Sequence, residues 1–141
     1  MIRAIIIDDE SYIRATIETY ILNNFSKDIR IVGQAHSVET SLETIGKLQP
    51  DLLFLDIELQ DGTGFDILER ITETNVNVIF ITGYNNHAIK AIKVGALDYV
   101  LKPINEQELK VAVLKAIENF SKSKETSKLL EISTAYFRGF K

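Results

Sequence analysis

The sequence predicts an α/β fold, a mostly parallel five-stranded sheet with helices on both faces. Two observations support this prediction. Short apolar runs alternate along the chain with segments whose apolar residues recur at helical spacing. The runs consist of consecutive bulky residues, which is typical of strands covered on both faces. Short connections between the segments fit right-handed crossovers.

The first elements alternate in this way. Residues 4–7 predict a buried strand that ends in acidic residues. Residues 11–25 predict a helix, with Asn23 and Asn24 as its end and an apolar face formed by Ile13, Ile17, Tyr20 and Ile21. Residues 29–35 are more polar and suit a strand at the edge of the sheet.

A second helix and the central strand follow. Ser37 is a candidate N-cap, and Pro50 prevents the helix from continuing. Residues 52–55 are four bulky apolar residues in succession, so they predict a short strand buried on both faces. Asp56 stands where this strand ends. In open α/β sheets, ligands bind at the carboxyl ends of the strands, which makes Asp56 a candidate functional residue.

The remaining elements continue the pattern. Phe65, Leu68 and Ile71 mark a third helix, and residues 78–81 predict a buried strand. A short fourth helix, with Ala88, Ala91 and Ile92 as its apolar residues, is expected to close at Gly95 in the left-handed conformation.

Residues 98–101 predict the last strand, which the pair Lys102-Pro103 ends. The fifth helix has the clearest start, because Asn105 followed by Glu108 resembles a capping box. Its apolar stripe comprises Leu109, Ala112, Val113, Ala116, Ile117 and Phe120.

Composition fits one domain and a tail. The chain has 141 residues, of which 45% are hydrophobic, enough for one core. Residues 1–120 hold 11 basic and 18 acidic residues, whereas residues 121–141 hold five basic and two acidic ones. We therefore predict a domain over 1–120 and a basic helical extension or linker over 121–141. The acidic balance of the domain disfavours non-specific binding of nucleic acid.

The absence of cysteine excludes disulfides and thiolate metal sites, and we expect a cytoplasmic location. No signal peptide is recognisable, and no apolar run is long enough to span a bilayer, so no membrane association is expected.

Polar residues end four of the predicted strands. Asp8 and Asp9, Asp56, Thr82 and Lys102 should meet in space, because parallel strands place their carboxyl ends at one edge of the sheet. Two carboxylates about 4 Å apart repel by roughly 4 kcal/mol at an effective dielectric near 20. A divalent cation that prefers oxygen ligands offsets this repulsion, and Mg²⁺ is the natural candidate.

The same cluster suggests phosphoryl transfer. An aspartate can act as a nucleophile and form an acyl phosphate. The metal, the Lys102 ammonium and the Thr82 hydroxyl could then each serve one phosphoryl oxygen. The strand ends carry neither a catalytic triad nor a glycine-rich dinucleotide loop, which argues against hydrolase and dehydrogenase functions.

Together, Asp8-Asp9, Asp56, Thr82 and Lys102-Pro103 resemble, in identity and order, the receiver domain of two-component response regulators. The resemblance implies a doubly wound, flavodoxin-like five-stranded sheet of strand order 2-1-3-4-5. It also implies phosphorylation by a sensor histidine kinase. Asp56 matches the phosphoacceptor and Lys102 the phosphate-binding lysine, with a cis peptide bond before Pro103.

The resemblance also implies ligands for Mg²⁺ and two switch residues. Asp9 matches a direct metal ligand, Asp8 an acidic partner that acts largely through water, and Glu58 the position whose backbone carbonyl binds the metal. Thr82 and Tyr99 match the hydroxyl and aromatic residues of the switch. For Tyr99 alone, half-buried packing is the simpler alternative.

Residues 82–99 are similar in particular to receivers that precede LytTR-type DNA-binding domains. The chain stops at Lys141 without such a domain, so DNA would be contacted only through an output domain outside this chain. The family commonly forms homodimers through its fourth helix, fifth strand and fifth helix. Val111 and Leu114 lie off the apolar stripe of the fifth helix and are candidate interface residues, although two scattered surface apolar residues are also common.

Three functions compete. The first is the receiver half of a transcription regulator, which is a phosphoacceptor rather than an enzyme. The second is a stand-alone receiver that binds a partner protein, and the reading frame beyond Lys141 would distinguish it from the first. The third is a magnesium-dependent aspartyl phosphatase with Glu58 as general acid, but no segment could serve as its substrate cap.

Overall fold

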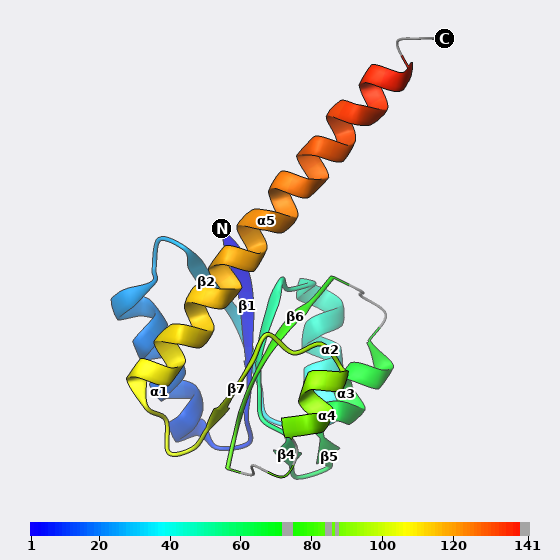
Figure 1. The fold of residues 1–141 in the computed structure, drawn as a ribbon. Helices are drawn as coiled ribbons and strands as arrows, with labels where there is room; N and C mark the ends of the chain where they lie inside the picture. Colours follow the sequence, from blue (N-terminus) through cyan, green and yellow to red (C-terminus); the bar gives the residue numbers. More distant parts are fainter. Residues whose placement is uncertain (72–74, 84–85, 87, 139–141) are drawn as a thin grey trace.

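The central sheet has five parallel strands in the order β2-β1-β3-β6-β7 (Figure 1). In the computed structural model, the residues described are 1–71, 75–83, 86 and 88–138, with side chains described as far as Lys124 except at position 89. Counted along the chain, the sheet has the predicted order 2-1-3-4-5, and the predicted fold class is confirmed. The strands are β1 (Ile2–Ile7), β2 (Ile29–Ala35), β3 (Leu52–Leu55), β6 (Asn77–Thr82) and β7 (Asp98–Leu101).

In the described part of the chain, five helices cover the sheet, with α1 and α5 on one face and α2, α3 and α4 on the other (Figure 1). Each follows a strand, as right-handed crossovers between parallel strands require. Their bounds are α1 (Ser11–Asn24), α2 (Val38–Leu48), α3 (Gly64–Arg70), α4 (Ala88–Lys93) and α5 (Glu106–Arg138).

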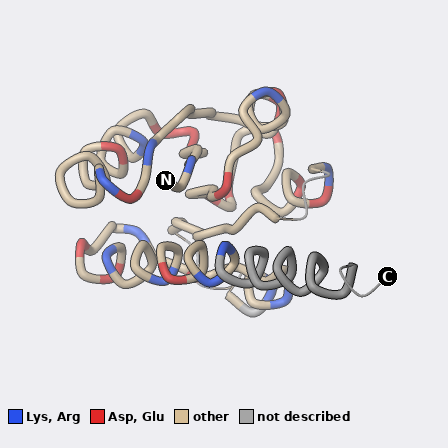
Figure 2. Tube along the Cα trace, turned by 90° about the horizontal axis from the view of Figure 1, so that it is seen from above, with Lys and Arg blue, Asp and Glu red and all other residues tan. Residues whose placement is uncertain are grey.

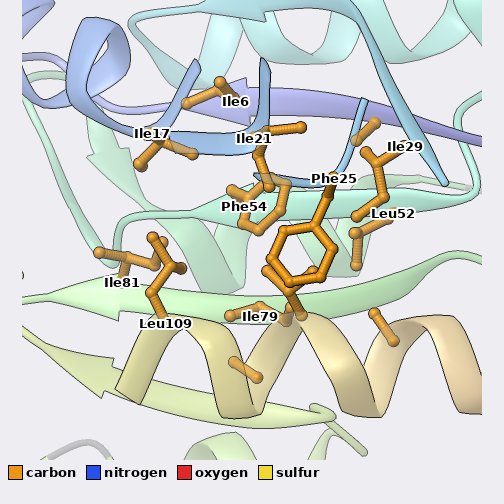
Figure 3. Close-up of a cluster of buried hydrophobic side chains, with 14 of the residues drawn as sticks. Ile6, Ile17, Ile21, Phe25, Ile29, Leu52, Phe54, Ile79, Ile81 and Leu109 are labelled. Atoms are coloured by element: carbon orange, nitrogen blue, oxygen red, sulfur yellow. The ribbon is translucent and has the colours of Figure 1, made fainter. Parts of the chain in front are cut away.

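Two apolar cores among the described side chains hold these layers together. Side chains alternate along β1, so that Ala4 and Ile6 enter one core whereas Ile5 and Ile7 enter the other. A fully buried side chain of this kind contributes about 1.5 to 3 kcal/mol. The core beneath α1 and α5 is shown in Figure 3, with labels on Ile6, Ile17, Ile21, Phe25, Ile29, Leu52, Phe54, Ile79, Ile81 and Leu109.

A small antiparallel hairpin between β3 and α3 was not predicted. It pairs β4 (Glu58–Leu59) with β5 (Gly62–Thr63). Each strand has only two residues, too few to display an alternating pattern in the sequence.

The prediction that Ile92 belongs to the apolar face of α4 was wrong, because its side chain is 76% exposed. Ala91 is buried, and successive residues of a helix lie about 100° apart, which turns Ile92 away from the core. Gly95 closes α4 as predicted, with a φ of +80°. Residues 84, 85 and 87 of the segment similar to LytTR-type receivers lie outside the described residues.

Helix α5 begins at a side-chain cap and is 33 residues long. The Asn105 side chain accepts hydrogen bonds from the backbone N–H groups of Gln107 and Glu108, which confirms the predicted cap. The helix continues without a break at residue 120 and projects past the sheet (Figure 1). Its coloured part in Figure 2 carries both acidic and basic residues. Within the described ranges, no helix has the length and apolar character required to cross a membrane.

Candidate functional site

The polar residues at the strand ends meet at the carboxyl edge of the sheet, as predicted. Backbone hydrogen bonds extend the strand pairing just beyond the strands and fix these residues in place. Asp56 N donates to Ile7 O at 2.9 Å, and Lys102 N donates to Thr82 O at 2.8 Å. The sheet itself therefore positions the backbone of the site.

Three carboxylates form a candidate cation site. One oxygen from each of Asp8, Asp9 and Asp56 lies within 4.8 Å of the others, with Asp8 and Asp56 buried and Asp9 half-buried. A cluster of carboxylate oxygens suits a hard divalent cation such as Mg²⁺, whereas it offers no thiolate or imidazole for softer metals. The donor set thus fits the predicted ion.

Lys102 balances part of this charge. Its side chain is 17% exposed, and Nζ lies 2.9 Å from Asp8 Oδ2 and 3.0 Å from Asp56 Oδ2. Burial acts to lower the pKa of Lys102, but its contacts with Asp8 and Asp56 outweigh this effect and raise the pKa above its ordinary value. Lys102 is therefore charged and stands directly beside the candidate nucleophile.

The pKa of Asp8 is raised within this cluster. Burial raises the pKa of its carboxyl to about 6, despite the opposing effects of Lys102 and of the Glu10 N–H that donates to Asp8 Oδ1 at 2.9 Å. The nearby charge of Asp56 acts in the same direction as burial. A cation bound beside Asp8 would relieve this penalty, which is a second reason why the site fits Mg²⁺.

Thr82 presents a buried hydroxyl to the same edge. Its Oγ1 has no hydrogen-bond partner among the described residues, although a buried polar atom normally has one. Thr82 ends β6 at the edge of the sheet that also carries Asp56 and Lys102, so an unpaired hydroxyl there can receive a further polar group. A phosphoryl oxygen has the required acceptor chemistry.

The structure places Tyr99 and Glu58 near these residues without testing their predicted roles. Tyr99 is half-buried on β7, pairs with Phe80 of β6, and its ring centroid lies 6.1 Å from that of Phe80. Glu58 is in β4, and its N–H donates to Asp56 Oδ1 at 3.3 Å. Lys102-Pro103 has the predicted cis peptide bond.

The sequence prediction missed two residues that contact the site. Glu10 Oε2 lies 3.7 Å from Lys102 Nζ, and Arg14 Nη1 donates to Asp8 O at 2.7 Å. Glu10 could have been identified from its position directly after two aspartates. Arg14 gave no signal, because its contact depends on how α1 packs beside β1.

The candidate output residues are exposed as predicted. Val111 and Leu114 of α5 are 50% and 47% exposed. Other exposed large apolar residues occur on or next to α4 and β7, namely Ile92, Val94 and Leu101.

The chain matches known proteins over most of its length. The family model of the response regulator receiver domain matches residues 4–114. The sensory transduction protein LytT of Bacillus anthracis is 34% identical over 128 residues, which cover 89% of this chain and 50% of LytT. The transcriptional regulatory protein BtsR of Escherichia coli is 32% identical over 123 residues, which cover 86% of this chain and 51% of BtsR. This chain therefore spans about half the length of these relatives.

Solved structures show the same fold. The receiver domain of AraT, a response regulator from Geobacillus stearothermophilus, superposes with a TM-score of 0.78 and is 31% identical, covering 87% of this chain and 98% of that one. The response regulator domain of Thermotoga maritima CheB has a TM-score of 0.69 at 26% identity and covers 84% and 95% of the two chains. The match to LytT agrees with the predicted similarity to LytTR-type receivers. With its fold, its cluster at the strand ends and these matches, the chain belongs to the response regulator receiver domain family.

Proposed function

We propose that this chain is a phosphorylation-controlled switch in which Asp56 accepts a phosphoryl group from a sensor histidine kinase. The arrangement of Lys102 and Thr82 at the sheet edge that carries Asp56 gives the proposal its main support. Lys102 Nζ is held 3.0 Å from Asp56 Oδ2 while the buried hydroxyl of Thr82, at the end of the next strand, has no partner among the described residues. The Lys102 ammonium can bind an oxygen of a phosphoryl group on Asp56, and the Thr82 hydroxyl can donate to another.

The transfer forms one bond and breaks one. A carboxylate oxygen of Asp56 attacks phosphorus, a P–O bond forms, and the P–N bond to the kinase histidine breaks with its electron pair left on the imidazole nitrogen. Lys102 stabilises negative charge on the transferred group, and the Thr82 hydroxyl donates to one of its oxygens. Hydrolysis of the acyl phosphate restores the Asp56 carboxylate.

Asp8, Asp9, Asp56 and the backbone carbonyl of Glu58 would hold Mg²⁺. When bound, the ion supplies positive charge that offsets both the carboxylate repulsion and the charge of the phosphoryl oxygens. Without it, Asp8 and Asp56 depend on Lys102 for compensation.

The output of the switch is the surface formed by α4, β7 and α5, where Val111 and Leu114 are exposed. We propose that phosphorylation promotes a homodimer through this surface. LytT is described as a sensory transduction protein and BtsR as a transcriptional regulatory protein, and both are about twice as long as this chain. We therefore propose that the switch controls transcription through an attached DNA-binding output domain. We also propose that the protein acts in the cytoplasm, a location that the absence of cysteine fits.

We propose a phosphoacceptor rather than an enzyme that turns over separate substrates. The receiver would support only its own phosphorylation and dephosphorylation. An assay with small phosphate esters tests this directly, because sustained release of phosphate would instead support the aspartyl phosphatase alternative.

Acetyl phosphate with Mg²⁺ tests the acceptor. Intact mass spectrometry should show the addition of one phosphoryl group to the wild type and none to Asp56→Asn, because an amide is not a nucleophile. Asp28→Asn, at an exposed turn, is the matched control and should be labelled normally. Labelling of Asp56→Asn at the wild-type rate would refute the assignment.

A further inference from the structure

The segment between β3 and α3 carries two of the proposed metal ligands, Asp56 and Glu58. Its base is anchored to the sheet. Ile57 and Leu59 are buried in the core beneath α2 and α3, and Gly64 N donates to Ile57 O at 2.8 Å. The β4–β5 hairpin, Glu58 to Thr63, extends from this base.

The tip of the hairpin is bonded to a different element. Asp61 Oδ1 accepts a hydrogen bond from Val38 N at 2.7 Å, and Asp61 Oδ2 accepts one from Glu39 N at 3.1 Å. These amides belong to the first turn of α2, whose N–H groups have no partners within the helix. Asp61 satisfies them from a position 22 or 23 residues away in the chain.

The other cap of α2 is local and independent of the hairpin. Ser37 Oγ accepts from Thr40 N at 3.0 Å, and Thr40 Oγ1 accepts from Ser37 N at 3.1 Å. The first turn of α2 therefore has two separate caps. Only the one supplied by Asp61 connects the helix to the segment that bears Asp56 and Glu58.

Packing at Gly62 shows how closely the hairpin approaches its neighbours. Its φ is +155°, and a Cβ at this position would lie 2.7 Å from Asp66 Oδ2 and 3.1 Å from Val38 Cγ2. The residue next to Asp61 is thus confined between α2 and α3. A hairpin bonded at its tip and confined beside it has little freedom to shift.

We propose that Asp61 is a positioning residue for the metal site: by bonding to the first turn of α2, it holds the hairpin so that Glu58 and Asp56 are set for Mg²⁺. The inference rests on the proposed function, which assigns Mg²⁺ to this cluster. Groups that orient metal ligands from outside the coordination sphere commonly affect metal affinity by 10- to 100-fold.

Titration calorimetry with MgCl₂ on the unphosphorylated chain tests the proposal. Asp61→Ala should raise the Kd for Mg²⁺ about tenfold. Asp61→Asn keeps one acceptor oxygen and should give an intermediate Kd. The Asn variant also provides the test if the Ala variant does not fold.

Ser37→Ala is the matched control, because it removes the other cap of the same helix and leaves the hairpin bonded. It should lower the melting temperature and leave the Kd for Mg²⁺ unchanged. A wild-type Kd in folded Asp61→Ala, or an equal loss of affinity in Ser37→Ala, would overturn the positioning role alone. Failure of the wild type to bind Mg²⁺ would instead overturn the proposed metal site and this inference with it.

Discussion

Thr82 combines two properties that are costly together, complete burial and a hydroxyl without a partner in the described part of the chain. A buried polar group left unpaired costs about 1 to 3 kcal/mol. The unphosphorylated protein bears this cost, and a phosphoryl oxygen on Asp56 would remove it. Thr82 thus lowers the stability of the unphosphorylated protein and favours the state phosphorylated on Asp56.

We predict that Thr82→Val stabilises the unphosphorylated protein by about 1 kcal/mol, because it removes the unpaired hydroxyl and keeps a β-branched side chain in the strand. Thermal unfolding should show an increase in Tm of about 4 °C. Thr82→Ser, which keeps the hydroxyl and loses a methyl group, should melt below the wild type. A lower Tm for Thr82→Val would show that the hydroxyl has a stabilising partner.

We predict that Asp9→Ala sharply weakens the binding of Mg²⁺ and raises the stability of the metal-free protein, because it removes one of three mutually repelling carboxylates. Thermal melts with and without MgCl₂ test both effects. Glu69→Ala, which removes an exposed carboxylate from α3, should respond to Mg²⁺ like the wild type. An Asp9→Ala variant as responsive to Mg²⁺ as the wild type would contradict the assignment.

At the scale of residues, the sequence predicted those site residues that stand at the ends of strands. Asp8, Asp56 and Thr82 each end or follow a run of bulky apolar residues, so the topology alone brings them together. Arg14 and Asp61 were not predictable, because their contacts depend on the packing of helices against the sheet edge. The sequence shows no spacing that relates Asp61 to Val38.

At the scale of elements, the long strands and helices were predictable from runs and periodicity, and the β4–β5 hairpin was not. Its two-residue strands are stabilised by the anchoring of Ile57 and by the bonds from Asp61 to α2. The orientation of Ile92 was mispredicted for a related reason. In a six-residue helix, too few residues are present to distinguish the buried face from its flank.

The cap from Asp61 to α2 should depend on pH. Hydrogen bonds from the N–H groups of Val38 and then Glu39 lower the pKa of Asp61 below its ordinary value of 3.8. A carboxyl whose pKa is lower in the folded state contributes stability above its unfolded pKa and loses it as pH falls through the folded pKa. We therefore predict that the stability gap between wild type and Asp61→Ala is full at pH 7 and narrows below about pH 4.

Urea unfolding of the two proteins at pH 7, 5 and 3 provides the measurement. Ser37→Ala supplies the comparison, because a hydroxyl cap does not titrate in this range and its stability gap should stay constant. A gap for Asp61→Ala that is independent of pH would show that the charge of the carboxylate does not contribute to the cap.

At the scale of the whole molecule, strands of one sheet connect the proposed phosphoacceptor with the output surface, because Asp56 follows β3 and β7 is part of that surface. Thr82 ends β6, and Tyr99 lies on the neighbouring strand β7 in contact with the ring of Phe80. Movement of the Thr82 hydroxyl toward a phosphoryl group would open space in which Tyr99 could turn inward. That rotation would reshape the surface formed by α4, β7 and α5.

The shape of residues 121–141 was the least predictable feature at this scale. Their basic composition fitted either a helix or a linker, and nothing in the sequence decided between them. The structure continues α5 to Arg138 as one helix. Asn119 accepts a hydrogen bond from Asn77 at the start of β6, so the helix is tied to the same strand that carries Thr82 just before it extends beyond the domain.

We predict that phosphorylated protein self-associates more strongly than unphosphorylated protein and that Val111→Glu blocks this association. Allosteric coupling is typically about 1 to 3 kcal/mol, so phosphorylation should strengthen association by roughly 5- to 150-fold rather than create a new fold. A glutamate in a dimer interface would bury an unpaired charge. Sedimentation of labelled and unlabelled samples gives the association constants.

Leu22→Glu is the matched control, because Leu22 is also exposed, at 60%, but belongs to α1, which is not one of the elements of the proposed output surface. It should leave phosphorylation-dependent association intact, and both variants should be labelled on Asp56 at the wild-type rate. Equal association of phosphorylated and unphosphorylated wild type would refute the output surface without affecting the phosphoacceptor. Equal loss in both variants would mean that added charge anywhere opposes association. Loss in Val111→Glu alone would place the contact on α5 and show that phosphorylation of Asp56 acts on this surface.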